Sequence, residues 1–500
     1  MDLIGNLGLG LATVLAPHNV AYCFLGVLLG TLIGVLPGIG PTATISMLLP
    51  LTFTLSPESA LIMLAGIYYG AQYGGSTTAI LINLPGEISS SVTAIDGYQM
   101  ARQGRAGPAL AIAAIGSFFA GTVATLVIAL FALPLTAVAL RFQPAEFFSL
   151  MVLGLICSVA LAHGSILKAL AMIVLGLLLG LVGMDLYTGA QRFTLGQLAL
   201  YEGIDFVAVA IGVFGIAEII RNLENETARK VAIGKVTVLM PTRADLKVSF
   251  LPILRGTALG SMLGILPGGS ILAAFAAYTV EKRMSPTPER FGKGAIEGVA
   301  APESANNAGA QTSFIPMLTL GIPGNAVMAL MIGAMIIQSI TPGPNVAIQQ
   351  PALFWGVIVS MWVGNLLLVL LNLPLVGLWV RMLTIPYHFL FPAILIFSSI
   401  GVFSTHNNAF DLFTVAAFGL FGYVLIKLDC EPAPLLLGFV LGPLLEENLR
   451  RAMILARGDP SVFITRPISA TILGIAVIVL ALVLLPSISR KREEVFQEEE

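Results

Sequence analysis

Apolar runs long enough to cross a lipid bilayer recur along the whole chain, separated by short polar or Gly/Pro-rich segments. No Asp, Glu, Lys or Arg occurs in residues 3–57, 106–140 or 304–380. A membrane-spanning helix needs about 20 mostly apolar residues, so each of these stretches can hold one or more spans. We expect spans near residues 19–36, 58–82, 109–133, 145–162, 165–183, 204–220, 252–266, 314–339, 352–379, 386–403, 408–427 and 467–486. With shorter apolar pieces at 41–55, 269–280 and 432–445, the pattern predicts an all-α polytopic membrane protein with about 10–13 transmembrane or re-entrant helices.

The apolar pattern is duplicated, and both copies are interrupted by Pro-Gly pairs. The segment GTLIGVLPGIGP at 30–41 matches GSMLGILPGGSI at 260–271 when Pro37 is aligned with Pro267, an offset of 267 − 37 = 230. Farther along, ILINLPGE matches LTLGIPGN with Pro85 on Pro323, an offset of 323 − 85 = 238. Paired interruptions at corresponding positions point to a transporter site between two repeats. Because only the second copy follows a strongly basic segment, the repeats are expected to be inverted, with the N-terminus outside the cytoplasm.

Charge divides the chain into four parts. Residues 221–255 contain seven Lys or Arg, and the chain ends in the charged sequence SRKREEVFQEEE. Since positive residues near the ends of spans favour the cytoplasm, both segments are expected there. The expected parts are a first transmembrane repeat (1–220), a basic cytoplasmic linker (221–251), a second repeat with extra helices (252–487) and a charged cytoplasmic tail (488–500). The N-terminal sequence MDLIGNLGLG lacks the basic region of a signal peptide, so we expect an uncleaved start.

Composition narrows the function classes. The chain has 500 residues, of which 57% are hydrophobic and 10% charged, whereas a soluble domain carries about 25% charged residues. A net charge of −2 gives no reason to expect nucleic acid as a partner. The three Cys and four His are scattered and form no C-x-x-C motif, which predicts buried thiols, no metal site and no cofactor beyond a coupling ion.

The Pro-Gly breaks supply the chemistry of an anion site. In hydrocarbon, non-helical backbone persists only where protein or water satisfies its amides and carbonyls. A helix that resumes after a break presents free N–H groups and the positive end of its dipole. In the first copy Pro37 and Gly38 break the helix, Gly40 frees the backbone, and Thr42 and Thr44 add hydroxyls. The second copy offers the corresponding residues Pro267, Gly268, Gly269 and Ser270.

Uncharged polar side chains gather near the breaks in both copies. Amides, hydroxyls and backbone N–H groups suit a multiply charged anion, while one carboxylate, Glu303, can help to hold Na⁺ or carry a proton. The predicted substrate-binding residues are Pro37, Gly38, Gly40, Thr42, Ser76, Thr77, Thr78, Asn83, Pro85, Gly86, Pro267, Gly268, Gly269, Ser270, Asn306, Asn307, Pro323, Gly324 and Asn325. The predicted ion-coupling residues are Glu303, Thr44, Gln311 and Thr312.

The same residues also have structural interpretations that involve no binding site. Gly and Pro can kink membrane helices for packing alone, and Ser or Thr can bond back to its own helix. Glu303 can instead lie at the membrane interface. Two matched pairs of breaks, each followed by polar side chains, favour a binding site over packing kinks. Residues 94–109, with Asp96, Arg102 and Arg105, are expected to form a surface loop rather than to contact substrate.

These same stretches closely resemble the large membrane subunit of the tripartite tricarboxylate transporter (TctA) family. The resembling segments are GVLPGIGPTATISMLLPLTF, AGIYYGAQYGGSTTAILINLPGE and TAIDGYQMARQGRAG in the first half, and in the second EKRMSPTPERFGKGAIEGVAAPESANNAGAQTSFIPMLTLGIPGNAVMALMIGAM and ITPGP. The sequence PGGSIL departs from relatives, which often continue with another glycine. The resemblance covers most of the chain outside the tail.

The resemblance implies a multi-pass carrier of the bacterial inner membrane that imports carboxylates. It would act with a periplasmic solute-binding protein and with a small membrane subunit of about four helices. Transport would be secondary and driven by a Na⁺ or H⁺ gradient, and the chain contains no G-x-x-x-x-G-K-[ST] phosphate loop. An anion-permeable channel is the alternative function. A membrane enzyme would need a nucleophile–base pair or a metal cluster, and a receptor-like scaffold would leave the polar breaks unexplained.

Overall fold

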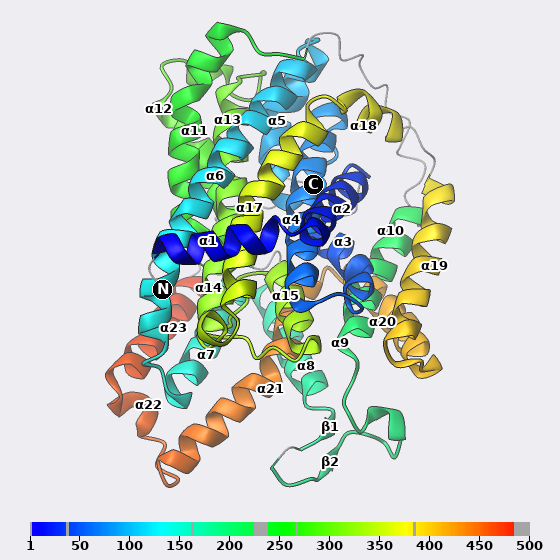
Figure 1. The fold of residues 1–500 in the computed structure, drawn as a ribbon, viewed down its shortest axis with the longest axis vertical. Coiled ribbons are helices and arrows are strands. Elements are labelled where there is room, and N and C mark those ends of the chain that lie inside the picture. The colour runs from blue at the N-terminus through cyan, green and yellow to red at the C-terminus, as the bar shows by residue number, and fades with distance from the viewer. Residues whose placement is uncertain are drawn as a thin grey trace.

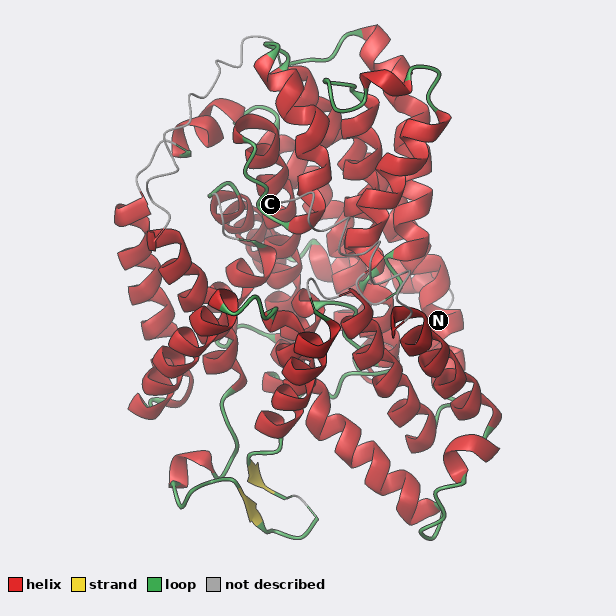
Figure 2. Cartoon of the chain, turned by 180° about the vertical axis from the view of Figure 1, so that it is seen from behind, coloured by secondary structure: helices red, strands yellow, loops and turns green. Residues whose placement is uncertain are grey.

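The computed structural model describes residues 3–36, 40–161, 165–185, 187–224, 239–266, 269–383 and 387–484. Helices make up nearly all of this part of the chain, as Figures 1 and 2 show. Strands β1 (Gly183–Met184) and β2 (Gln191–Arg192) form one short antiparallel pair that projects from one end of the molecule. The predicted all-α polytopic fold is therefore confirmed.

The helices of the first half are α1 (Leu3–Val14), α2 (Pro17–Gly34), α3 (Pro41–Leu48), α4 (Pro57–Ile82), α5 (Ile88–Arg102), α6 (Ala106–Ala139), α7 (Pro144–Leu161), α8 (Ile166–Gly180), α9 (Phe206–Ala210) and α10 (Ala217–Glu224), with η1 (Leu49–Thr52), η2 (Leu198–Leu200) and the π-helical η3 (Ile211–Ile216). Those of the second half are α11 (Arg243–Leu263), α12 (Gly269–Met284), η5 (Pro288–Arg290), α13 (Glu297–Thr312), α14 (Phe314–Leu320), α15 (Ala326–Ile337), α16 (Val346–Gln349), α17 (Pro351–Asn372), α18 (Val376–Met382), α19 (Tyr387–His406), α20 (Ala409–Lys427), α21 (Pro432–Leu455), α22 (Val462–Thr465) and α23 (Pro467–Leu484).

Among the described residues, five helices are long and apolar enough to cross a membrane: α2, α6, the continuous helix Phe206–Glu224, α17 and α20. The two central helices have a different character. All 16 residues of α13 are buried, although they include Glu303 and several amides and hydroxyls. Nearly all of α4 is buried as well, and it is rich in Gly, Tyr, Ser and Thr. Burial of polar helices inside a shell of apolar ones is typical of a membrane protein with an internal polar site.

Two parallel helix pairs are held together by glycines at four-residue spacing. On α2, a Cβ placed on Gly30 would lie only 2.3 Å from the Ile67 carbonyl oxygen of α4. On α11, a Cβ on Gly260 would lie 2.2 Å from the Ala305 oxygen of α13. Such close approach of backbones is the contact that small-xxx-small motifs allow. The same offsets, 260 − 30 = 230 and 305 − 67 = 238, relate the two pairs, so the sequence duplication is also a structural one.

The two halves run in opposite directions and are interleaved. Helices α4 and α13 cross antiparallel, since Ser76 bonds Glu303 while the earlier Gln72 bonds the later Asn306. Helix α3 of the first half packs on α15 of the second, and α12 packs on α5. In Figure 1, α5 lies in the upper part of the molecule and its counterpart α15 in the lower part. This arrangement is that of an inverted repeat.

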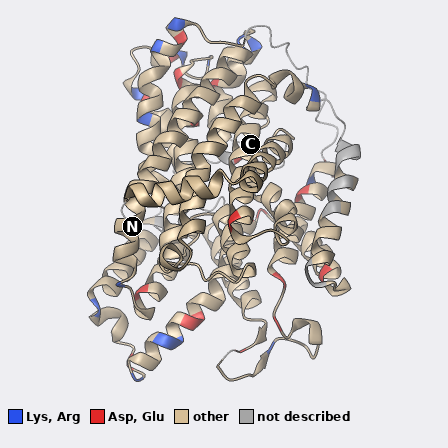
Figure 3. Ribbon diagram, viewed as in Figure 1, with Lys and Arg blue, Asp and Glu red and all other residues tan. Residues whose placement is uncertain are grey.

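Charged residues gather mostly at the two ends of the long axis, and few lie in the band between them, as the coloured ribbon of Figure 3 shows. This distribution is typical of a protein whose central band lies in the bilayer. Residues 225–238 of the predicted basic linker and residues 485–500 of the predicted tail lie outside the described residues. The ends of the predicted linker belong to α10 and α11. The side of the membrane on which each end lies, and the boundaries of the two repeats, stay predictions.

Three expectations about elements need correction. Helix α1 was not expected, and it packs against α17. The segment 94–109 is not a surface loop, because its first half belongs to α5 and Asp96 is completely buried. The predicted span 314–339 is two helices, α14 and α15, separated by the break near Pro323. For α1 and Asp96 the outcome depends on tertiary contacts, which a hydropathy profile does not contain, whereas the division of 314–339 follows from the break predicted at Pro323.

Candidate functional site

The second break in each half has the same backbone geometry. Helix α4 is terminated by Asn83 (φ 56°, ψ 32°) and α14 by Gly321 (φ 70°, ψ 29°), both left-handed. After the Pro-Gly pair, Glu87 (φ −150°, ψ 162°) and Asn325 (φ −158°, ψ 176°) occupy the N-cap positions of α5 and α15. A left-handed residue ends a helix and an extended residue begins the next. The breaks predicted at these two Pro-Gly pairs are therefore present.

The centres of the other two breaks, Pro37 with Gly38 and Pro267 with Gly268, lie outside the described residues. Their flanks are described: α2 ends before α3 begins at Pro41, and α11 ends before α12 begins at Gly269. A Cβ on Gly40 would lie 3.0 Å from the Gly86 oxygen. The start of α3 thus lies against the second break of the same half. The side chain of Ser270 is also outside the described part.

Glu303 on α13 is the carboxylate at the crossing of the two halves. Its side chain is buried, with 1% of the residue surface exposed. Ser76 Oγ of α4 donates to Oε2 at 2.9 Å, and Thr93 Oγ1 of α5 donates to Oε1 at 2.6 Å. No Lys, Arg or His of the described chain forms an ion pair with this carboxylate. Glu303 therefore lies inside the protein, between helices of both halves.

Asn306, one turn farther along α13, connects both halves near the second break. Its Nδ2 donates to Gln72 Oε1 of α4 at 3.0 Å and to Glu87 Oε1 at 2.6 Å. Its Oδ1 is buried and has no hydrogen-bond partner among the described residues. A buried acceptor left without a donor is uncommon, and it is expected where a ligand or water binds. Asn306 thus holds the carboxylate of Glu87, the N-cap residue of α5, at the crossing of α4 and α13.

The rest of the α13 polar face reaches α6 and α17. Asn307 Nδ2 donates to Ser117 Oγ at 2.7 Å. Gln311 accepts from Thr125 Oγ1 at 2.6 Å and donates to Asn365 Oδ1 at 3.0 Å. These contacts tie α13 to two apolar helices through single polar side chains. The structure therefore brings Ser76, Glu303, Asn306, Asn307 and Gln311 together around one helix face.

Other predicted residues satisfy their own helices. The hydroxyls of Thr44, Thr77, Thr78 and Thr312 donate to the backbone carbonyls of Gly40, Tyr73, Gly75 and Ala308, respectively. Local bonds of this kind are the plainer interpretation given above, and they apply to these four hydroxyls. Thr42 is half-buried at the start of α3, and Asn83 and Pro85 are exposed at the end of α4, while Pro323 and Gly324 are buried. Asn325 caps α15 by accepting from Met328 N at 2.8 Å.

Several residues of this network were not predicted as site residues from the sequence. They are Tyr73, Glu87, Thr93, Ser117, Thr125, Asn365 and Asn372. One pattern could have found part of this set. Asn365 and Asn372 are amides seven residues apart on one face of the mostly apolar α17, and isolated amides in such a helix tend to face other helices.

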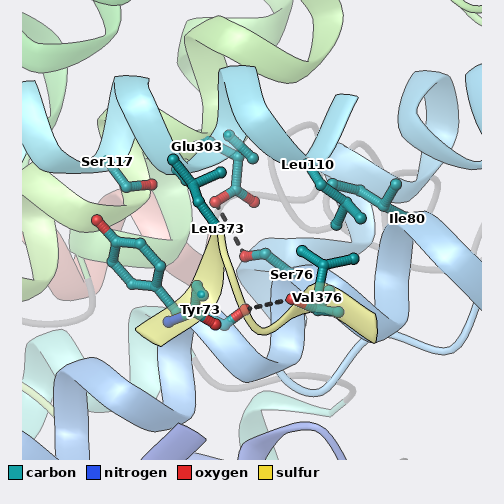
Figure 4. A pocket seen from close by; sticks show the side chains of 12 residues that line it. Tyr73, Ser76, Ile80, Leu110, Ser117, Glu303, Leu373 and Val376 are labelled. Atoms are coloured by element: carbon teal, nitrogen blue, oxygen red, sulfur yellow. Dashed lines mark hydrogen bonds between the residues drawn. The ribbon is translucent and has the colours of Figure 1, made fainter. Parts of the chain in front are cut away.

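A small recess opens beside Glu303, as Figure 4 shows. Its polar wall consists of Glu303, Tyr73, Ser76, Thr77, Ser117 and Asn372. Ile80 and Leu110 lie on the apolar side, together with Leu373 and Val376. The cavity has a volume of about 20 Å³, which is room for a single water molecule. It is too small for a tricarboxylate, so this conformation is closed around Glu303.

The sequence is similar to proteins of a described transporter family. The sequence profile described as the tripartite tricarboxylate transporter TctA family matches residues 20–437. The chain is similar to an uncharacterized 52.8 kDa protein in the TAR-I ttuC' 3' region of Agrobacterium vitis, with 65% identity over the full length of both chains. It is also similar to an uncharacterized protein in the TAR-II ttuC' 3' region of the same organism, with 66% identity over 48% of this chain and all of that protein. No solved structure matches.

The profile match covers both sets of helix breaks and the buried polar helix α13. The chain therefore belongs to the tripartite tricarboxylate transporter TctA family, a family of membrane transporters.

Proposed function

We propose that this chain is the large membrane subunit of a secondary active importer for tricarboxylates or related organic acids. The observation that carries the proposal is the inverted crossing of α4 and α13, with a buried polar face between two broken helices. A site at the interface of two inverted repeats lets the protein open alternately to either side. The setting would be the bacterial inner membrane.

The breaks explain how such a site can bind a carboxylate. Helices α5 and α15 resume in the interior at Glu87 and Asn325, and α3 resumes nearby at Pro41. The first N–H groups of a resumed helix are unpaired within that helix and favour an anion. Asn306 and Asn307 lie within the same layer, where their Nδ2 groups donate to Glu87 Oε1 and Ser117 Oγ and hold these side chains in place. Helix ends recognise the anionic group more than the carbon skeleton, so several organic acids fit this proposal.

Coupling to a cation follows from the balance of charge. The polar centre contains the carboxylates of Glu303 and Glu87, and among its described residues there is no Lys, Arg or His. An anionic substrate entering beside two carboxylates would be repelled unless a proton or Na⁺ entered with it. We therefore propose symport, with Glu303 as the group that carries the cation or binds it.

The partners are proposed on the family's pattern. A periplasmic solute-binding protein would deliver the substrate, and a small membrane subunit of about four helices would complete the transporter, since the family is tripartite by description. An open channel fits less well, because the recess beside Glu303 has room for only about one water molecule.

The test is reconstitution of the three subunits in vesicles with a radiolabelled tricarboxylate outside. Imposed Na⁺ and pH gradients are applied separately, with a no-gradient control. We expect saturable uptake that exceeds the equilibrium concentration only when a gradient and the binding protein are both present. Uptake that is linear in concentration and independent of any gradient would indicate the channel instead.

A further inference from the structure

The recess beside Glu303 has oxygen atoms that the protein itself leaves unpaired. Asn372 Nδ2 donates to Leu368 O at 2.9 Å, so the amide nitrogen is satisfied by its own helix. The Oδ1 of Asn372 and the hydroxyl of Tyr73 have no hydrogen-bond partner among the described residues. Both residues line the recess and are only 6% exposed. Buried polar atoms without partners call for a bound species that satisfies them.

The electrostatics of the recess favour a cation. The Glu303 carboxylate accepts hydroxyl hydrogen bonds from Ser76 and Thr93 and forms no ion pair with a described basic residue. The 22-residue helix α17 also ends at Asn372, so the negative end of its dipole lies at the same recess. A carboxylate and a helix C-terminus side by side repel an anion and attract a positive ion.

We propose that this recess binds a sodium ion, held by Glu303, Asn372 and Tyr73. The inference rests on the proposed function, because it names the ion of the coupled transport and its place. The available volume of about 20 Å³ accepts one small ion or one water molecule. Carboxylate, amide and hydroxyl oxygens are the ligands of hard cations. A single carboxylate in the wall suits a monovalent ion better than Ca²⁺, whose sites contain several carboxylates.

The site also connects the parts that must move. Its ligands come from α4, α13 and the end of α17, which belong to both halves of the molecule. An ion that bridges them stabilises one relative position of the halves. A water molecule would satisfy Asn372 and Tyr73 but would leave the charge of Glu303 uncompensated.

The experiment measures thermal unfolding of the purified full-length protein in detergent, with NaCl replacing choline chloride at constant ionic strength. Binding to the folded state raises the Tm as the ion concentration passes its Kd. We expect wild type to be stabilised by Na⁺. Asn372→Leu and Tyr73→Phe should each raise the half-saturating Na⁺ concentration about tenfold, the effect of losing roughly 1.4 kcal/mol of binding.

The matched control is Ser360→Ala, on the same helix. Ser360 is buried and bonds only its own helix through its hydroxyl, to Val357 O, and it does not line the recess. This variant should keep the wild-type Na⁺ response. Asn372→Leu can lower stability in itself, so the variants are compared by their half-saturating Na⁺ concentration and not by their absolute Tm. Tyr73→Phe provides an independent second variant.

Each remaining result overturns one of the two proposals. An unchanged half-saturating concentration in both variants, or no Na⁺ response in wild type, would overturn the sodium site. Wild-type accumulation of substrate under a pH gradient alone would do the same and would assign a proton to Glu303. By contrast, an intact Na⁺ response at this site with no carboxylate uptake by the reconstituted transporter would overturn the proposed function and leave the ion site standing.

Discussion

Glu303 is held by two hydroxyl donors that come from different helices of the opposite half, Ser76 on α4 and Thr93 on α5. Hydrogen bonds to an ionised group are worth about 1.5–3 kcal/mol each, more than those between neutral groups. These two bonds fix the orientation of the carboxylate and stabilise its charged form. Ser76 and Thr93 are therefore positioning residues for whatever cation Glu303 binds.

Removal of either hydroxyl should weaken the coupling and leave the fold intact. For Ser76→Ala and Thr93→Val we expect the coupling-cation concentration for half-maximal uptake to rise about tenfold. The measurement is uptake against cation concentration at saturating carboxylate. Thr122→Val is the control, because the Thr122 hydroxyl donates to the Phe118 carbonyl of its own helix and does not contact Glu303. An unchanged cation dependence in both test variants would contradict the role of these hydroxyls.

Asp96 is a second buried carboxylate, and its hydrogen bonds have a structural role. Its Oδ1 accepts from the backbone N–H groups of Gly292, Gly294 and Ala295 at 2.8–2.9 Å, and its Oδ2 accepts from Tyr278 Oη at 2.9 Å. The carboxylate thereby fixes the segment that leads into α13. Because that segment aligns Glu303, Asp96 supports the site from a distance.

Asp96→Asn should destabilise the protein, because the backbone N–H groups lose a charged acceptor and an amide nitrogen replaces the oxygen that accepts from Tyr278 Oη. We expect a loss of about 2 kcal/mol of unfolding free energy. Tyr278→Phe, which loses one of the four bonds, should cost less. Denaturant unfolding in detergent measures both. If Asp96→Asn were as stable as the wild type, the hydrogen bonds to Asp96 would contribute little to stability.

The residue types of the site could be predicted from the sequence better than their partners. The cluster on α13 was identified because Glu303, Asn306 and Asn307 stand in an otherwise uncharged stretch. Their partners Ser117 and Thr125 were missed, because single hydroxyls in an apolar helix have no distinctive local pattern. Only the crossing of helices far apart in the chain reveals them.

At the scale of elements, the parallel pairs α2–α4 and α11–α13 depend on glycine. The backbones are so close that no Cβ fits between them at the contact positions. The four-residue spacing of Gly26, Gly30 and Gly34 is visible in the sequence, and it recurs at Gly256, Gly260 and Gly264. The sequence does not show which helix each row of glycines contacts, because packing partners depend on the fold.

A methyl group at these contacts should separate the helices. Gly30→Ala and Gly260→Ala place Cβ 2.3 Å and 2.2 Å from a backbone oxygen, so the backbone must shift. We expect each to lose about 1–3 kcal/mol of stability, the usual effect of overpacking. Gly474→Ala on α23 is the control, since its Cβ meets nothing within 4 Å. The prediction fails if all three variants unfold alike.

The short hairpin β1–β2 is attached to α21 by a charged cluster outside the spanning helices. Asp185 accepts from Arg450 Nη2 at 2.8 Å, from Tyr187 N at 2.8 Å and from Thr188 N at 3.1 Å, and it also pairs with Arg192. Burial alone would raise the pKa of Asp185. The backbone N–H groups and the two guanidinium groups outweigh burial and hold that pKa below its usual range.

This lowered pKa has a definite consequence for pH dependence. A carboxyl group with a lowered pKa contributes stability above its unfolded pKa, and that contribution is lost as the pH falls through the folded value. The hairpin should therefore stay attached from pH 7 to pH 5. Hydrogen exchange of residues 183–192, corrected for intrinsic rates, should be constant over that range and faster at every pH in Asp185→Asn. Loss of protection between pH 6 and 5 in wild type would contradict the assignment.

At the scale of the whole molecule, the two halves are related by inversion and share one polar layer. The duplication was predictable from two sequence offsets, and the inversion from the position of basic residues. The interleaving was not, because it places α3 on α15 and α12 on α5 across the halves. Because helices of the two halves pack on one another in this way, Glu303 of the second half accepts hydrogen bonds from residues of the first half. A relative movement of the halves must therefore alter the surroundings of Glu303.

The most direct test of this account is to compare two transport modes of Glu303→Gln in one vesicle preparation containing all three subunits. Gradient-driven accumulation should fall at least about tenfold, because glutamine has no negative charge to hold a coupling cation and no carboxyl group to carry a proton, while exchange of substrate without a gradient persists. Glu289→Gln, at an exposed glutamate, should behave as wild type. Accumulation by Glu303→Gln to the wild-type level would contradict the central claim that this carboxylate couples the gradient to transport.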